Sequence, residues 1–198
     1  MLSSIHPLGE RTRGNRWSVT AAYYVAGSTV GGAGLGGLLG IIGAGAASVW
    51  NPADSVVIGM VIAVLALSAL LDLTRVRVPS LDRQVDETWM NRYRSWVYGG
   101  GFGFQLGTGV MTFVKTASIY ALWILVVLGG SPVGGLVVGA WFGLVRAAAL
   151  LTVGGVHDPA TLRSYFRRMA DLGPAAHAVA VAGPIAATIV VLVGWVKT

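Results

Sequence analysis

The residues best suited to chemistry in this sequence lie in one apolar stretch, residues 97–123. Lys115 stands near its middle, where a cation costs about 2.5–3.5 kcal/mol on membrane-insertion scales and usually faces a water-filled cavity or a partner. Three polar side chains precede it at spacings that place them near the same helical face. Arg146 supplies a second cation in the next apolar stretch. We therefore expect a substrate-binding site made of Lys115, Gln105, Thr108, Thr112 and Arg146.

Two cations without an acid at comparable depth favour a small anionic substrate, or a polar one that offers carbonyl oxygens. A structural alternative stays open for each cation. Arg146 could extend to the inner membrane surface, and Lys115 could be neutral or bonded to backbone carbonyls. Access of water to Lys115 separates these interpretations, because a transport site is wet and a packing contact is dry.

Other kinds of chemistry find little support in the sequence. The chain has no cysteine, which excludes disulfides, thiolate metal sites and cysteine nucleophiles. His6, His157 and His177 are scattered, without the spacing of metal ligands. We therefore expect no metal, no cofactor and no catalytic residue, which favours a role other than catalysis.

Glycine clusters mark the two longest apolar stretches. The runs GGAGLGG and GGGFG lack the preceding strand and the GK[ST] ending of a phosphate-binding loop. Glycines in apolar helices instead let a neighbouring helix approach closely. We expect this packing role for Gly27, Gly34, Gly107 and Gly109.

The composition indicates an all-α integral membrane helical bundle that forms a single domain over residues 1–198. Mean hydropathy is +0.71 and only 11% of residues are charged. Five apolar runs approach or exceed the roughly 20 residues that span hydrocarbon. These runs are Ser18–Val49, Ser55–Leu71, Val97–Gly130, Val133–Val153 and Ala175–Val196. The first is too long for one upright helix, so it is either a helix kinked at the glycine cluster or a re-entrant pair.

The positive charges predict the orientation in a bacterial cell membrane. The formal net charge is +6, but the arginines flank apolar runs, which favours lipid phosphate over nucleic acid as their partner. If Arg11–Arg16, Arg75–Arg94 and Arg163–Arg168 are all cytoplasmic, five spans follow, with the N-terminus inside and the C-terminus outside. Residues 80–96 and 159–172 are predicted as cytoplasmic surface helices, each with apolar residues at helical spacing beside arginines.

Local signals predict several helix ends. Asn51-Pro52 makes a turn, and Asp54-Ser55 can cap the helix that follows. Asp158 is placed as a cap, with Pro159 as the first helical residue. Asp72, at the inner end of the second span, is expected to pair with Arg75 across one turn.

The sequence matches itself weakly when it is shifted by about eighty residues. Val56–Leu71 then falls on Leu136–Leu151, and Gly27 falls on Gly107. This match predicts an internal repeat with units 17–75 and 97–154, each a glycine-rich span followed by a plain one, and a final span at 175–196. The two glycine-rich spans would then pack together.

The segment Gly99–Tyr120, the turn Ser131-Pro132 and the GxxxG-like pair Gly139 and Gly143 resemble one half of a known family. It is the DsbD/CcdA-like cytochrome c biogenesis transmembrane family, in the wider LysE- and sulfite-exporter-like group. That family transfers electrons through a cysteine in the first helix of each half, and this chain has none. The resemblance therefore implies a relative that kept the scaffold without the redox chemistry, and no functional residue is carried over.

Two functions from different classes follow. The first is a small transporter or exporter with its site near Lys115, between the glycine-rich spans. The alternative is a non-catalytic membrane subunit that scaffolds or partners a larger complex concerned with redox chemistry or biogenesis. The expected partners are the lipid bilayer, a small anionic or polar substrate, and either further copies of the chain or a larger membrane complex.

Overall fold

The computed structural model describes residues 5–76, 78–79, 92–109, 116–156 and 158–196, and every regular element in them is helical. Four helical stretches of this part of the chain are long and apolar enough to cross a membrane, namely Trp17–Trp50, Asp54–Leu73, Pro132–Gly155 and Pro159–Trp195. The predicted helical bundle is thus present, but the prediction of five long spans is replaced by four.

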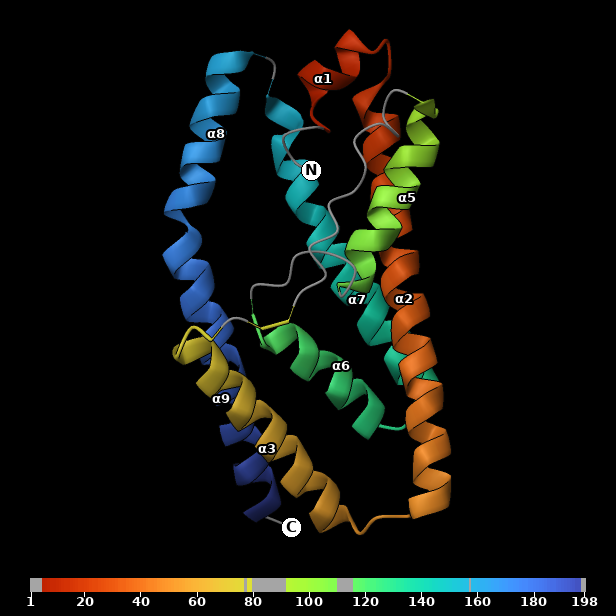
Figure 1. The fold of residues 1–198 in the computed structure, drawn as a ribbon, viewed down its shortest axis with the longest axis vertical. Coiled ribbons are helices and arrows are strands. Elements are labelled where there is room, and N and C mark those ends of the chain that lie inside the picture. Colours follow the sequence, from red (N-terminus) through yellow and green to blue (C-terminus); the bar gives the residue numbers. More distant parts are fainter. Residues whose placement is uncertain (1–4, 77, 80–91, 110–115, 157, 197–198) are drawn as a thin grey trace.

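The missing span is the predicted third one, at residues 97–130. It is divided between α5, Ser95–Thr108, and α6, Ser118–Leu128, and neither helix reaches 18 residues. α5 ends because Gly109 adopts a left-handed conformation with φ +73°. Such a residue stops helical hydrogen bonding and is a common helix C-cap. In Figure 1 the two helices follow one another down the bundle at different levels.

The central element is α2, a single helix over Trp17–Trp50. Its 34 residues rise about 51 Å, well beyond the roughly 30 Å of a hydrocarbon core. The interpretation of this stretch as a re-entrant pair is therefore wrong. Its nine glycines do not break it, because α5 and a second helix, α7 (Pro132–Leu151), pack along most of its length (Figure 1).

α2 and α7, Pro132–Leu151, run antiparallel with their backbones in direct contact. Gly32 faces Gly139, and Gly36 faces Gly135. A methyl group added at any of these four positions would overlap the carbonyl group of the facing residue. Glycine at four-residue intervals therefore sets the distance between the helices, as in other close-packed membrane helices.

α5 lies on another side of α2 and runs parallel to it. Gly103 meets the carbonyl of Tyr24, and Gly107 meets that of Ser28. The predicted packing of the two glycine-rich stretches is therefore present, although α5 covers only the N-terminal half of α2. Ser28 also donates a hydrogen bond of 2.7 Å from its hydroxyl to the carbonyl of Gly143 in α7, so one turn of α2 holds both neighbours.

The remaining long helices are α3, Asp54–Leu73, and α9, Gly173–Val196, which lie beside each other and contact α6. The expected Asp54-Ser55 cap is not formed. Ala53 occupies the N-cap without a side-chain hydrogen bond, and Asp54 is the first helical residue. There its negative charge lies at the favourable, positive end of the helix dipole.

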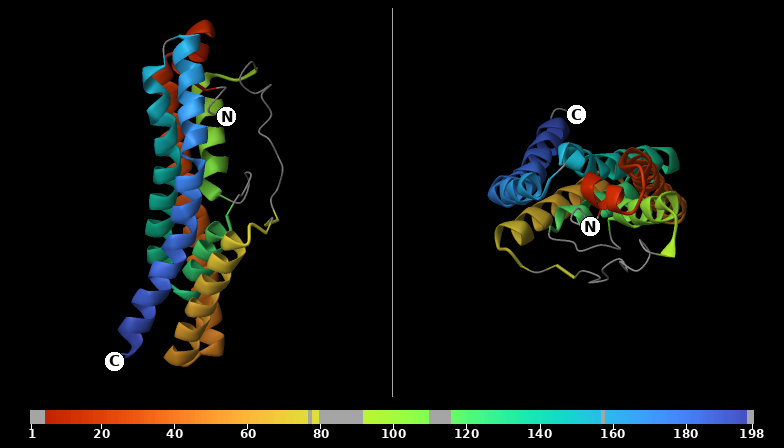
Figure 2. Two further views of the ribbon diagram at one scale, coloured as in Figure 1. Left: turned by 90° about the vertical axis from the view of Figure 1, so that its left-hand side faces the viewer. Right: turned by 90° about the horizontal axis from the view of Figure 1, so that it is seen from above.

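Two short α-helices, and a 3₁₀ turn at Thr152–Gly155 that follows α7, complete the described structure. α1, Pro7–Thr12, lies across the end of the bundle where α2 and α5 begin (Figure 1). α8, Pro159–Asp171, runs along the bundle and leads into α9 (Figure 2). The predicted start of α8 is confirmed, because the Asp158 carboxylate accepts from the amides of Ala160 and Thr161, each at 2.8 Å. Most of the predicted surface helix 80–96 lies outside the described residues, and its last two belong to α5.

Candidate functional site

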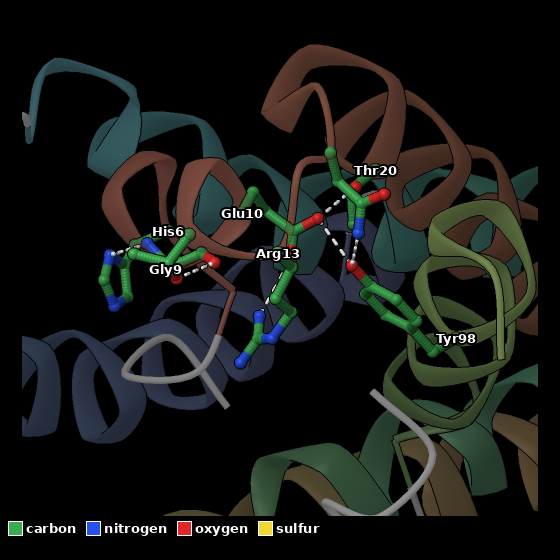
Figure 3. Close-up of polar contacts among 8 residues, drawn as sticks. His6, Gly9, Glu10, Arg13, Thr20 and Tyr98 are labelled. Carbon is green, nitrogen blue, oxygen red and sulfur yellow. Dashed lines mark hydrogen bonds and ion pairs between the residues drawn. The ribbon is translucent and has the colours of Figure 1, made fainter. Parts of the chain in front are cut away.

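One polar cluster joins α1 to the first turns of α2 and α5 around the fully buried Glu10 (Figure 3). One carboxylate oxygen accepts from Arg13 at 3.0 Å. The other accepts from the hydroxyls of Thr20 at 2.7 Å and Tyr98 at 2.5 Å. Asn15 donates its side-chain amide to the same tyrosine oxygen at 3.2 Å. Every carboxylate oxygen therefore has a donor, which is the condition for keeping a charge buried.

This cluster fixes α1 rather than opening a reactive site. Glu10 is enclosed on all sides, and the next buried layer is apolar, with Ile5, Tyr98 and Phe102 in one core cluster. Glu10 is not among the site residues predicted from the sequence. The sequence feature that could have indicated it is an acidic residue inside an arginine-rich segment directly before an apolar span. Its partners in distant parts of the sequence become visible only in the folded structure.

His6 caps the first turn of α1 by accepting the Gly9 amide at its Nδ1 atom, at 3.1 Å. Only a neutral imidazole nitrogen can accept this bond. Burial lowers the pKa of His6 from its ordinary value, and the positive charge of Arg13 acts in the same direction, whereas Glu10 opposes it. The neutral form is thus the one that the fold selects.

A second polar region lies at the break between α5 and α6. Asp72, near the end of α3 and only 5% exposed, caps the start of α6 from a distance. Its carboxylate accepts from the amide of Ala117 at 2.6 Å, and from the amide and hydroxyl of Ser118 at 3.2 and 2.7 Å. The Ser118 hydroxyl also lies 3.0 Å from the carbonyl oxygen of Ala180 in α9.

The expected pairing of Asp72 with Arg75 is therefore wrong. Arg75 lies beyond the end of α3 with φ +54°, in a left-handed turn. The amide donors at the N-terminal end of a helix are the stronger attraction for a buried carboxylate, because they combine hydrogen bonds with the positive end of the helix dipole.

Arg146 occupies the other side of the break. Its guanidinium carbon lies 5.4 Å from the centre of the Phe142 ring, within cation–π distance. The Phe142 ring in turn meets Trp123 of α6 edge-on, with ring centres 5.1 Å apart. A methyl group built on Gly109 would lie 3.2 Å from a terminal nitrogen of Arg146. The cation is therefore beside the C-cap residue of α5, at the negative end of that helix dipole.

The break is thus bracketed by two charges of opposite sign that come from other helices. Arg146 of α7 lies at the C-terminal end of α5, and Asp72 of α3 lies at the N-terminal end of α6. Helix ends in an apolar environment need such partners, because their terminal amides and carbonyls have none within the helix. The arrangement explains why these two charges are tolerated inside apolar helices.

The structure describes only part of the predicted substrate site. Lys115 and Thr112 lie outside the described residues. Gln105 and Thr108 belong to the last turn of α5, where the buried Thr108 hydroxyl donates to the Gln105 carbonyl at 2.8 Å. Arg146 lies beside the residue that follows this turn, so three of the five predicted residues gather at one end of α5.

The predicted packing glycines divide into three kinds. Gly27 and Gly107 lie directly against the backbones of Gly100 and Ser28. Gly34 instead faces open space, with no atom within 4 Å of an added methyl group. Its neighbours Gly32 and Gly36 make the contacts, because they lie on the side of α2 that faces α7. Gly109 serves mainly as the C-cap of α5, where its left-handed backbone conformation requires glycine.

The fold and the site together define a class, a helical bundle with four helices able to cross a membrane and an interrupted helix pair held by buried charges. Within the described residues, no group of three His, Cys, Asp or Glu side chains is arranged to hold a metal ion.

Three curated proteins are similar to this chain, and all carry the name methylamine utilization protein MauF. The protein from Paracoccus denitrificans is 36% identical over 150 residues, which cover 73% of this chain and 53% of the relative. The Paracoccus versutus protein is 34% identical over 148 residues, with coverage of 73% and 54%. The Methylophilus methylotrophus protein is 32% identical over 155 residues, with coverage of 73% and 52%. The chain thus spans about half the length of the curated relatives it matches.

No protein-family model matches the chain, and no solved structure matches it. The resemblance to the DsbD/CcdA-like family is therefore wrong, because the matching relatives carry a different name and nothing points to that family. The resemblance rested on glycine-rich texture, and close-packed membrane helices of any family share that texture.

Proposed function

We propose that this chain is a non-catalytic integral membrane protein that supports the utilization of methylamine, as a subunit that holds a larger membrane assembly together. The methylamine role is taken from the names of the three relatives. The membrane location is supported by the four long apolar helices. We retain the orientation inferred from the arginines, with the N-terminus cytoplasmic and the C-terminus outside. This orientation needs a fifth crossing, which α5 and α6 would make together as one interrupted span.

The observation that favours a subunit over a carrier is the internal pairing of most buried polar side chains in the described residues. The indole N–H groups of Trp17 and Trp123 are the exceptions, since both are buried without a hydrogen-bond partner. Each buried Asp, Glu, His, Ser and Thr side chain of the described residues bonds to a group of the chain itself. The residues are His6, Glu10, Thr20, Ser28, Ser68, Asp72 and Thr108. A transport site needs polar groups that can exchange their partners for those of a substrate.

The helix contacts support the same conclusion. The expected transport site lay between the two glycine-rich stretches, but there the backbones of α2 and α5 touch, as at Gly103 and Gly107. Methylamine itself is a cation at neutral pH, and Arg146 beside the break would repel it. A bundle whose helices touch backbone to backbone is better suited to positioning partners than to moving solutes.

A second candidate function is a carrier of small anionic or polar molecules. It is favoured by the break between α5 and α6 beside Arg146, because interrupted helices with a nearby charge form the binding sites of many transporters. Under this candidate, Gln105 and Thr108 at the end of α5 would contribute to the site with Arg146, and the two repeat units would move against each other.

A gene deletion tests the proposal in the organism that encodes the chain. Cells without the gene should lose growth on methylamine, while growth on an unrelated carbon source and the initial uptake of labelled methylamine stay unchanged. The same cells carrying a tagged copy should regain growth, and the tagged chain should copurify with other membrane proteins in fixed proportion.

Two results would overturn the proposal. Unchanged growth of the deletion strain on methylamine would show that the chain is not needed for methylamine utilization. Loss of solute uptake in cells whose extracts still oxidise methylamine would favour the carrier. The variant Arg146→Met distinguishes the candidates further, since a carrier would lose its substrate affinity and a subunit would change only in stability.

A further inference from the structure

The helix α8 carries a basic, amphipathic surface that the rest of the bundle leaves largely uncovered. Its apolar residues lie along one edge at helical spacing and are only half-buried, while the other side chains are exposed. The edge consists of Leu162, Tyr165, Phe166 and Met169. On a helical wheel Arg163 and Arg168 flank this edge, one on each side, whereas Arg167 lies nearly opposite it.

Few contacts hold α8 against the bundle. The Tyr165 hydroxyl lies 2.6 Å from the Thr152 hydroxyl at the end of α7, and this bond is exposed. The other substantial contact is with α9, which follows directly after Leu172. Gly173 at this junction has no atom within 4 Å of an added methyl group, so nothing packs against the link. Backbone hydrogen bonds from Leu172 to Arg168 and from Ala176 to Leu172, of 3.1 and 2.9 Å, cross this junction, so a change in the angle between α8 and α9 must bend the helix there.

The charges on α8 specify the partner. Asp158 is engaged as the N-terminal cap, and Asp171 lies at the far end of the helix on the side opposite the apolar edge. The surface between them is purely cationic. A helix with an apolar edge flanked by arginines, joined to a long apolar helix, matches the boundary between anionic headgroups and acyl chains.

We propose that α8 is a lipid-binding element that leaves the Thr152 contact and docks its apolar edge on the anionic headgroup layer. Arg163 and Arg168 would bind lipid phosphates beside this edge, and Arg167 would add positive charge to the helix. This assignment does not depend on the role in methylamine utilization. It gives the bundle a surface that responds to the charge of the surrounding membrane.

Single-site labelling tests the assignment, since the chain contains no cysteine. An environment-sensitive fluorophore is attached at Met169→Cys, on the apolar edge, or at Ser164→Cys, on the opposite side. The full chain is placed in nanodiscs of phosphatidylcholine alone or with a quarter of phosphatidylglycerol. We expect the label at position 169, and not that at 164, to shift to the blue and to resist iodide quenching when phosphatidylglycerol is present.

The arginines provide the decisive comparison. Each basic residue near an anionic surface changes membrane partition about fivefold, so replacing the three arginines of α8 by Gln should weaken docking on the order of 100-fold. The matched control replaces Arg11, Arg16 and Arg94 by Gln, which removes the same charge from exposed positions elsewhere. This control should keep the response at position 169. High salt should reduce the response of the unmodified chain.

Three results would overturn the proposal. One is equal shielding of position 169 in both lipids, which would show that α8 stays on the bundle. Another is an equal loss of the response in the two triple variants, which would assign it to net charge alone. The third is shielding that appears only when an acidic protein is added and never with phosphatidylglycerol, which would make the partner a protein.

Discussion

Replacing Asp72 should destabilise the bundle more than replacing any exposed acid, because this carboxylate holds the start of α6. In Asp72→Ala the amides of Ala117 and Ser118 lose their acceptor, whereas the Ser118 hydroxyl keeps the carbonyl of Ala180. A buried donor left without a partner costs about 1–3 kcal/mol. Two such donors predict a loss of about 2–4 kcal/mol in the free energy of unfolding, after allowing for relief of the desolvated charge.

The control is Asp54→Ala, which removes an acid from the other end of the same helix. Asp54 is exposed and makes no capping bond, so its loss should cost only the dipole interaction, about 0.3–1 kcal/mol. Asp72→Asn should fall between the two. Its amide oxygen can still accept from Ala117, but its NH₂ group would face the donors of Ser118.

The assay is reversible unfolding of the purified chain in mixed micelles, with detergent as the denaturant and helix content as the signal. The reasoning would be refuted if Asp72→Ala cost no more than Asp54→Ala. It would also be refuted if Asp72→Asn were as stable as the unmodified chain, since the charge on the carboxylate would then contribute nothing to the cap.

The same unfolding assay, together with limited proteolysis of α1, checks three further expectations. Gly36→Leu should prevent stable folding, because the added atoms overlap the backbone of α7. In Gly34→Leu the new side chain points into open space, so the free energy of unfolding should change by less than about 0.5 kcal/mol. Equal effects of the two substitutions would contradict the assigned register of α2 against α7. Tyr98→Phe leaves Glu10 with one donor fewer and should cost about 1–3 kcal/mol, with proteolysis near α1 as a second measurement. The lowered pKa of His6 means that its neutral cap stabilises α1 fully above pH 6.5 and is progressively lost as the pH falls below that value, so protease sensitivity of α1 should rise on acidification and become less dependent on pH in His6→Ala.

Local signals in the sequence determined the class of the fold. The apolar runs are long enough to span hydrocarbon wherever they pack, so the helical bundle follows from composition and periodicity. The start of α8 was also predictable, since Asp158 and the proline after it act within a single turn. The glycine clusters also predicted close helix packing, although they did not show which glycines would take part.

Only the tertiary structure decided the features that depend on distant partners. Asp72 is hydrogen-bonded to Ala117, which is 45 residues away in the sequence, and Glu10 is hydrogen-bonded to Tyr98, which is 88 residues away. Neither partner could be predicted from neighbouring positions. Gly34 and Gly36 look alike in the sequence, but the register of α2 against α7 buries one and leaves the other open. The long predicted span at 97–130 is divided because the left-handed Gly109 ends α5. Both new helix ends lie beside a charge from another helix. The Asp72 carboxylate accepts from the first amides of α6, and the Arg146 guanidinium lies beside Gly109 at the C-terminal end of α5.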